Sequence, residues 1–156
     1  DKASKWDVFR DLVIKYEKKN NTTITHLVDL DVTVPRRTKN HIDGCISTAL
    51  KSNTDVVITG YEPERNPYFN MMEETENGNA IIVKKLKKPI VCRQDAPTVF
   101  SLSPAVYVVK RDALFNYDHW SNATCKIYPI PRELAIDIDT ELDFKLVEFL
   151  IQNTNE

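Results

Sequence analysis

Residues 55–61 read DVVITGY, a run whose centre is apolar at three consecutive positions. Val56, Val57 and Ile58 are β-branched, and a continuous apolar run of this kind is typical of a strand buried on both faces of a sheet. Strand-like and helix-like segments alternate on either side of it. This alternation predicts an α/β fold with a mainly parallel sheet.

The remaining elements follow from hydrophobic spacing and capping residues. Helices are expected at 4–19, from 38 or 40 to 50, at 111–115 and at 140–152, the last with Thr140 as N-cap. Strands are expected at 24–31, 80–83 and 105–110, with extended segments at 125–130 and 133–139. Only three core strands stand out, whereas a doubly wound sheet normally has five or more. The sheet is therefore expected to be incomplete at the N-terminus.

Residues 62–103 differ in amino-acid composition from the rest of the chain. Four prolines fall in this stretch, and charged residues cluster at 73–76 and 84–88. We expect an arm or subdomain inserted into the α/β domain, which then comprises residues 1–61 and 104–156.

Composition excludes several classes of function. The chain has 21 basic and 23 acidic side chains, so its net charge of −2 does not favour a nucleic-acid partner. With 3 glycines among 156 residues, no glycine-rich phosphate loop can be assembled. The apolar runs are too short to cross a membrane. The 3 cysteines are widely spaced, which argues against a disulfide framework or a zinc site and fits a reducing cytoplasm.

Asp137 and Asp139 form the sharpest local signal, in the stretch IDIDT at 136–140. In an extended segment, residues two apart point to the same side, so the two carboxylates would lie together just before a helix. Such a pair suits Mg²⁺, which takes one or two carboxylates together with phosphate oxygens. The alternative is an N-capping aspartate beside a solvated one.

Three further clusters could bind a ligand, although each is also typical of an exposed or structural segment. Arg93 and Gln94 could hold a carboxylate and a hydroxyl, or form a surface turn. Arg37 follows Arg36 after a strand, where guanidinium groups suit phosphate or carboxylate, or simply mark a helix entry. Tyr68 and Phe69 form an aromatic pair that could contact a ligand or anchor the arm.

Taken together and in order, five blocks resemble the bacterial acylneuraminate cytidylyltransferases, also called CMP-sialic acid synthetases. The blocks are SKWDVFR, DVTVPRRT, DVVITGYEPERNPYFNM, CRQDAPTVFSLSPAVYVVKRD and IDIDTELDFKLVEFL. The resemblance covers nearly the whole chain. It implies a Rossmann-like nucleotidyltransferase domain and a homodimer whose arm reaches the partner's active site. It also implies transfer of CMP from CTP to a nine-carbon keto-acid sugar, with Mg²⁺ and release of pyrophosphate.

The resemblance also implies roles for individual residues. Asp137 and Asp139 would hold the metal and, with Arg37, form the catalytic set. The residues that would contact substrate are Asp31, Thr33, Tyr68, Phe69, Arg93, Gln94, Phe100 and Ser103. Asp31 stands where the family usually has glutamine, and Arg36 where it has leucine. Ser103-Pro104 replaces Asn-Gly or Asn-Ala, and Pro104 has no backbone donor.

The family's first block, a loop that holds the CTP phosphates, has no counterpart in these residues. We therefore expect the chain to be part of a larger synthetase and to be inactive alone. A different reading is a truncated, non-catalytic module that binds sugar or mediates dimerisation. A third is a nucleotidyltransferase for 3-deoxy-octulosonate, although the stretch around Tyr68 and Phe69 favours the acylneuraminate branch.

Overall fold

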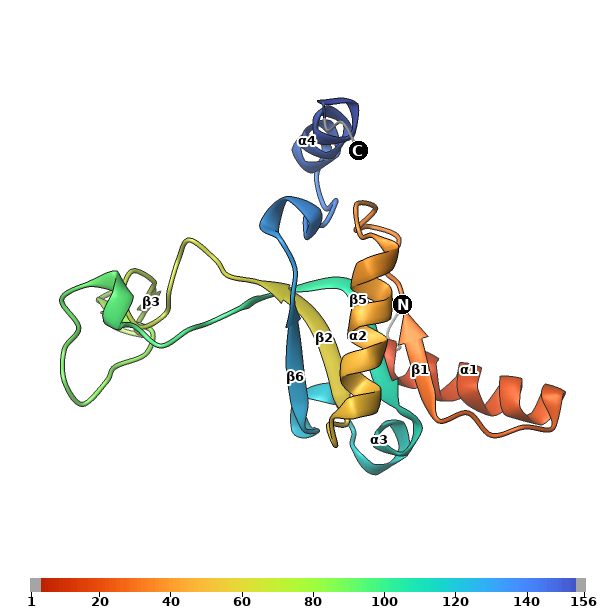
Figure 1. Cartoon of the computed structure of the whole chain (residues 1–156). Helices are drawn as coiled ribbons and strands as arrows, with labels where there is room; N and C mark the ends of the chain where they lie inside the picture. Colours follow the sequence, from red (N-terminus) through yellow and green to blue (C-terminus); the bar gives the residue numbers. More distant parts are fainter. Residues whose placement is uncertain (1–3, 154–156) are drawn as a thin grey trace. The chain divides into compact units, whose positions relative to one another are not determined.

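The computed structural model describes residues 4–153, and the chain divides into two compact units (Figure 1). The sheet unit lies within Asp1–Tyr61 and Leu102–Glu156, and the inserted unit is Glu62–Ser101. No helix among the described residues is long and apolar enough to cross a membrane.

A four-stranded sheet forms the centre of the sheet unit. Its strands lie in the order β1 (His26–Asp29), β5 (Ser101–Lys110), β2 (Val56–Tyr61) and β6 (Cys125–Pro129). β2 and β6 are parallel, whereas β1 and β5 are antiparallel. β5 also runs against β2, because Lys110 donates to the carbonyl of Asp55 while Val106 meets Thr59. The prediction of a mainly parallel sheet is therefore wrong for β5, and the sheet is mixed.

The direction of β5 follows from how the chain reaches it. The chain leaves the sheet at the end of β2, passes through the inserted unit and re-enters beside β2. β5 starts at the end of the sheet where β2 finished, so it must run in the direction opposite to β2. A strand parallel to β2 would need a connection that first returns to the end of the sheet where β2 began. The chain between β2 and β6 makes such a return.

Of the two other segments expected to be extended, the first is confirmed and the second is wrong. Residues 125–130 supply a full sheet strand, β6, in parallel register with β2. Residues 133–139 do not join the sheet, because a 3-10 turn at Arg132–Leu134 is followed by irregular backbone. Pro129 and Pro131 precede this segment, and proline cannot donate to a sheet ladder.

The helices agree closely with their sequence signals. They are α1 (Lys5–Asn20), α2 (Lys39–Lys51), α3 (Arg111–Asn116) and α4 (Glu141–Asn153). Ser4 caps α1 by accepting a hydrogen bond from the Asp7 amide at 3.1 Å. Thr140 caps α4 in the same way, and Asp143 accepts reciprocally from the Thr140 amide at 2.8 Å, which completes a capping box.

Each face of the sheet is covered by one helix, with a hydrophobic cluster beneath it. The cluster under α1 contains Trp6, Phe9, Val13, Val56, Ile58, Val109, Ala113 and Leu114. The cluster under α2 contains Val34, Cys45, Ala49, Val57, Ala105, Val106, Val108, Ile130 and Ala135. Gly44 lets α2 approach the sheet, because a Cβ there would lie 2.5 Å from Cζ of Tyr128.

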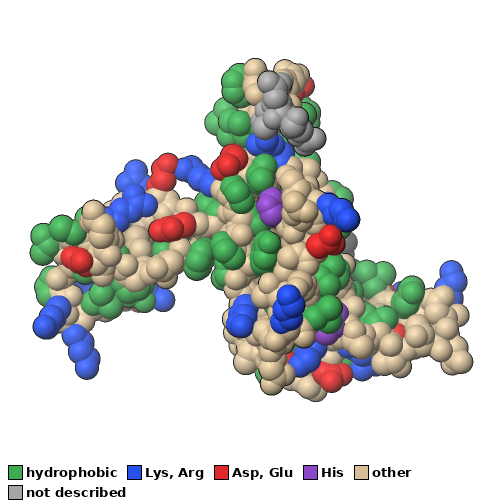
Figure 2. Space-filling view, viewed as in Figure 1, with side chains coloured by type: hydrophobic (Ala, Val, Ile, Leu, Met, Phe, Trp, Pro, Cys, Tyr) green, Lys and Arg blue, Asp and Glu red, His purple; other side chains and the backbone are tan. Residues whose placement is uncertain are grey.

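α4 buries a different side chain from those expected. The sequence places Leu142, Leu146, Phe149 and Leu150 on one apolar face, yet Val147 is the buried residue. Leu142 is 74% exposed and Phe149 is 59% exposed. Hydrophobic side chains are accordingly visible on the surface over α4 (Figure 2).

An ion pair joins α1 to the start of α3. Nε and Nη2 of Arg111 lie 2.7 and 2.9 Å from the two carboxylate oxygens of Glu17, and the Ile24 amide donates to the same carboxylate at 3.0 Å. The hydrogen bonds from Arg111 hold the pKa of Glu17 below its ordinary value; burial opposes them, and the Ile24 amide adds to the lowering. A depressed folded-state pKa adds stability above the ordinary pKa and loses it as the pH falls through the folded-state value.

We therefore expect Glu17→Gln to be less stable than the parent chain at pH 7, with the difference shrinking below about pH 4. Urea unfolding at pH 7, 5, 4 and 3 measures this directly. Glu148→Gln, on an exposed part of α4, serves as the control and should change little at any pH. A difference that stays constant across the series would show that the charge of Glu17 is not responsible.

The inserted unit has its own small framework. β3 (Met72–Glu74) and β4 (Ala80–Ile82) form an antiparallel hairpin, and a 3-10 turn spans Arg93–Asp95. Asn66 is buried, accepts from the Tyr68 amide at 2.9 Å and donates to the carbonyl of Pro97 at 3.0 Å. A single amide side chain thus ties together residues that lie 31 positions apart in the sequence.

Candidate functional site

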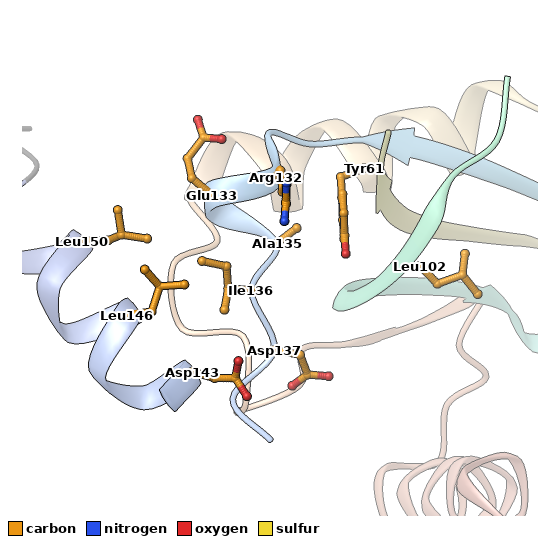
Figure 3. Close-up of a pocket in the computed structure, with 10 residues that line it drawn as sticks. All are labelled: Tyr61, Leu102, Arg132, Glu133, Ala135, Ile136, Asp137, Asp143, Leu146 and Leu150. Carbon is orange, nitrogen blue, oxygen red and sulfur yellow. The ribbon is translucent and has the colours of Figure 1, made fainter. Parts of the chain in front are cut away.

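A cavity of about 530 Å³ lies in the sheet unit between the end of the sheet and α4 (Figure 3). It is lined by Tyr61, Leu102, Arg132, Glu133, Ala135, Ile136, Asp137, Asp143, Leu146 and Leu150. Three carboxylates, those of Glu133, Asp137 and Asp143, and the guanidinium of Arg132 line it beside apolar side chains. Polar groups in such a setting are typical of ligand sites.

Asp137 is the most unusual residue of this cavity. Its Oδ1 atom is buried, and no described residue offers it a hydrogen bond. The backbone around it is held firmly, because the Ile138 amide donates to the carbonyl of Thr33 at 2.9 Å. A buried carboxylate oxygen without a donor costs free energy, so it is retained where a ligand or cation satisfies it.

Asp139 lies in a different setting from Asp137. It is exposed and does not line the cavity, and its amide donates to Oδ2 of Asp143 at 3.3 Å. Asp143 lines the cavity with Asp137 and Glu133, and it also takes part in the cap of α4. Hydrogen bonds from the Thr140 hydroxyl and amide, and more weakly from the Asp139 amide, hold the pKa of Asp143 below its ordinary value.

A group of charges gathers where β1 ends. Nζ of Lys5 lies 2.7 Å from Oδ2 of Asp29 and 3.0 Å from Oδ2 of Asp31. The contact between Lys5 and Asp29 is an ion pair. Burial lowers the pKa of Lys5, but its two carboxylate partners outweigh burial and raise it. Lys5 therefore stays charged.

Tyr107 connects this group to Asp137. Lys5 Nζ lies 4.7 Å from the centre of the Tyr107 ring. Burial raises the pKa of the Tyr107 hydroxyl, and the charges of Asp29, Asp31 and Asp137 raise it further while Lys5 lowers it. Three carboxylates and one ammonium group thus act on the same phenol.

Asp31 and Thr33 are bonded to each other. Oδ1 of Asp31 accepts from the Thr33 hydroxyl at 3.0 Å. Burial would raise the pKa of Asp31, but hydrogen bonds from Lys5 and Thr33 hold it below its ordinary value. Asp31 is therefore a charged carboxylate whose two oxygens already accept hydrogen bonds, one from Lys5 and one from Thr33.

Arg37 braces the loop that follows β1. Its Nη1 donates to the carbonyls of Asp31 and of Val34, the latter at 2.8 Å. Arg36 donates to the carbonyl of Glu133 at 2.9 Å. Both arginines, with Lys39, line a separate basic cavity of about 850 Å³, so Arg37 and Asp137 line different cavities.

The expected substrate residues of the inserted unit also divide between two cavities. Arg93 and Gln94 line one of about 300 Å³, where Nη2 of Arg93 donates to the carbonyl of Pro63 at 3.1 Å. Tyr68 and Phe69 line another of about 330 Å³, and Lys84 Nζ lies 5.5 Å from the centre of the Tyr68 ring. Phe100, near the end of this unit, is 40% exposed.

Ser103 is part of the interior of the sheet unit. It is 1% exposed, and its hydroxyl donates to the carbonyl of Ala135 at 3.0 Å. In this structure the hydroxyl therefore holds the segment that carries Asp137 against β5. Its expected contact with substrate stays a prediction.

Sequence reasoning missed four residues of this region, namely Lys5, Asp29, Tyr107 and Asp143. Asp29 lies two residues before Asp31 on an extended segment, so the same alternation that singled out Asp137 and Asp139 would have paired them. Asp143 was expected only as a first-turn residue of the helix. For Lys5 and Tyr107 no local signal existed, because each reaches the site through tertiary packing.

The residues present fit a magnesium ion. Among residues 4–153 no group of three or more His, Cys, Asp or Glu side chains could hold a metal by itself. Mg²⁺, however, needs only one or two protein carboxylates when phosphate oxygens and water complete its shell. The buried Oδ1 of Asp137, which has no hydrogen-bond donor among the described residues, is a group of the kind that could serve as such a ligand.

Comparison with known proteins finds relatives of this chain. The Campylobacter coli protein named post-translational flagellin modification protein B is 33% identical over 155 residues. The CMP-N,N'-diacetyllegionaminic acid synthase of Campylobacter jejuni is likewise 33% identical over 155 residues. An N-acylneuraminate cytidylyltransferase of Streptococcus agalactiae serotype III is 23% identical over 145 residues. The chain is similar to proteins of the acylneuraminate cytidylyltransferase family.

The coverage of these matches is unequal. The Campylobacter matches take in 99% of this chain but 65% of each relative. The streptococcal match takes in 92% of this chain and 33% of that relative. The chain thus spans somewhat less than two thirds of the Campylobacter members of the family. No family model matches it.

Proposed function

We propose that this chain is the metal-binding part of a synthase that transfers CMP from CTP to an acylneuraminate-type nonulosonic acid. The observation that carries the proposal is the Oδ1 atom of Asp137, buried and unpartnered among the described residues, in a cavity of a chain similar to that family. The name of the C. jejuni relative, a CMP-N,N'-diacetyllegionaminic acid synthase, supports the substrate class.

In the proposed reaction, the anomeric hydroxyl of the sugar attacks the α-phosphorus of CTP. A new oxygen–phosphorus bond forms, the bond between the α-phosphorus and its bridging oxygen breaks, and pyrophosphate leaves with the electron pair. The hydroxyl proton is released. Catalysis of this kind depends mainly on positioning and on neutralising phosphate charge.

Residues of this chain supply part of that machinery. Asp137, with Asp139 as the resemblance implies, would hold Mg²⁺, which when bound neutralises charge on the CTP phosphates. Hydrogen bonds from Ser103 to Ala135 and from Ile138 to Thr33 fix the segment on which Asp137 lies. Arg37 holds the carbonyls of the loop after β1 and so keeps Asp31 and Thr33 in place.

We further propose that the inserted unit mediates homodimerisation and contributes Arg93, Gln94, Tyr68 and Phe69 to the sugar site. Its separation from the sheet unit as a compact body supports this role. As the resemblance implies, we also assign Phe100 and Ser103 to the substrate side.

The test is a CMP-transfer assay on two proteins. One is this chain alone. The other, called the chimera below, is the C. jejuni relative with its matched residues replaced by this chain. With CTP, N,N'-diacetyllegionaminic acid and Mg²⁺, we expect the chimera to release pyrophosphate and form the CMP-sugar, and this chain alone to form none.

A chimera that folds cooperatively and makes no CMP-sugar, while the C. jejuni relative does so in the same assay, would contradict the proposal. Retained sugar binding in that chimera would then favour a non-catalytic module. An acylneuraminic acid offered in place of the legionaminic acid measures which sugar is preferred.

A further inference from the structure

Three strands of the sheet unit end at the same edge of the sheet. β1 and β2 each run antiparallel to β5, which lies between them, and β6 is parallel to β2. The loops that follow β1 and β6 meet at this edge, where the Ile138 amide donates to the carbonyl of Thr33 at 2.9 Å. Ligands of α/β proteins bind outside the carboxyl ends of parallel strands. Asp29 and Asp31 therefore lie at the same edge as the segment that carries Asp137.

Lys5 brings a positive charge to this edge from another element. It is the first residue of α1, whose start is fixed by the Ser4 cap, and Trp6 buries this end of the helix. Nζ of Lys5 lies 2.7 Å from Oδ2 of Asp29 and 3.0 Å from Oδ2 of Asp31. An ammonium group has three N–H donors, so two carboxylate partners leave one donor over. The Lys5 side chain is 43% exposed, so a ligand can approach it.

The carboxylate of Asp31 is held at both oxygens. Oδ2 accepts from Lys5 and Oδ1 accepts from the Thr33 hydroxyl, each at 3.0 Å. The Asp31 amide donates to the carbonyl of Pro104 at 3.3 Å, so the backbone is held as well. Each carboxylate oxygen can accept a second hydrogen bond, and the Asp31 side chain is 29% exposed. Asp31 thus has one orientation and can still accept a hydrogen bond from a ligand.

Lys5 is also the counter-ion of an acidic group of residues. The carboxylates of Asp29, Asp31 and Asp137 and the ammonium group of Lys5 all act on the Tyr107 hydroxyl. Both substrates of the proposed reaction are anions, one through its phosphates and the other through its carboxylate. A carboxylate without a counter-ion repels an anion, most strongly where it is partly buried. With Lys5 in place, Asp29 and Asp31 together keep a single net negative charge.

We infer that Lys5 is a positioning residue of the substrate site. It holds Asp31 in one orientation and reduces the negative charge there, so that Asp31 can accept a hydrogen bond from a hydroxyl or amino group of an anionic substrate. The inference rests on the proposed function for the identity of that substrate. CTP and the nonulosonic acid share this chemistry, and the experiment separates them.

The experiment compares charge-matched variants of the chimera. Lys5→Met removes the cation and should raise the KM of at least one substrate by about tenfold or more, while kcat changes by less than threefold. A KM raised for CTP alone assigns Asp31 to the nucleotide, and one raised for the sugar alone assigns it to the sugar. Because Lys5 is partly exposed, thermal unfolding should change little.

A second substitution tests the role of charge. Asp31→Asn added to Lys5→Met restores the single net negative charge and keeps the shape of the side chain. The double variant should have a KM at least about fivefold lower than that of Lys5→Met, a coupling expected only of residues that act together. Lys15→Met is the control, because Lys15 pairs with Asp11 at 2.6 Å on the same helix and is 72% exposed. It should change neither KM.

Each other outcome decides between the two proposals. Normal CMP transfer with both KM values unchanged in Lys5→Met, or with no recovery in the double variant, overturns the inference alone. So does a Lys5→Met variant that unfolds, or one that loses kcat with both KM values unchanged, because the role of Lys5 is then structural. A chimera that binds both substrates without CMP transfer contradicts the proposed function, and dissociation constants then replace KM. A chimera that binds neither substrate overturns both.

Discussion

An Asp137→Asn variant of the chimera is expected to lose on the order of 10²–10³-fold in kcat while folding at least as well as its parent. Asparagine keeps the shape of the side chain but removes the negative charge that the proposed magnesium ion would bind. Among residues 4–153 no group donates a hydrogen bond to Oδ1 of Asp137, so the substitution breaks no hydrogen bond at that atom within the described fold. Initial rates over a range of Mg²⁺ concentrations, together with thermal unfolding, measure both halves of this result.

Asp112→Asn is the matched control, because Asp112 is 78% exposed at the start of α3 and far along the chain from the cavity. It should leave rates and unfolding unchanged. A loss of less than about threefold for Asp137→Asn would contradict the metal role.

Asp139→Asn and Asp143→Asn, measured in the same way, show which second carboxylate sets the Mg²⁺ requirement. The family resemblance predicts Asp139, although Asp143 shares the cavity.

Leu114→Ala is expected to destabilise the sheet unit by about 2–5 kcal/mol. Leu114 is fully buried in the cluster that packs α1 and α3 against the sheet. Truncation would remove its buried methyl groups and leave a cavity that rigid neighbours cannot fill. Trp6 lies in the same cluster, so its fluorescence during urea unfolding reports on this unit directly.

Leu50→Ala provides the comparison, because Leu50 is 65% exposed near the end of α2. It should shift the free energy of unfolding by no more than about 0.5 kcal/mol. Similar small values for both variants would mean that the α1 cluster is loosely packed, contrary to the structure.

Local signals determined most of the elements but not the direction of one strand. The helix spacing and the caps at Ser4 and Thr140 placed α1 and α4 to within a residue, because capping is a short-range interaction. The apolar run at 105–110 marked β5 but gave no direction. Direction depends on which edge of the sheet the chain re-enters, and that depends on the 40-residue excursion between Glu62 and Ser101.

For the candidate site too, local sequence signals singled out some residues, whereas contacts made by tertiary packing were missed. The spacing of Asp137 and Asp139 predicted a metal site, which stays a prediction. In the structure Oδ1 of Asp137 is buried without a donor among the described residues, whereas Asp139 is exposed. The ion pair from Lys5 to Asp29 and Asp31 could not be foreseen, because it joins positions up to 26 residues apart through the packing of α1. The sequence treated Tyr68 with Phe69 and Arg93 with Gln94 as separate clusters, and the folded unit likewise places them in different cavities. That both contact the substrate follows only from the family resemblance and stays a prediction.

The antiparallel pairing of β2 with β5 has a consequence for chain entropy. Tyr61 and Leu102 line one cavity, so the whole inserted unit begins and ends at neighbouring points of the sheet. In polymer terms it is one loop, and doubling the length of such a loop adds only about 0.6 kcal/mol to its closure cost. The length of this segment can therefore change greatly at little cost to the sheet, which leaves it open to evolutionary insertion and deletion.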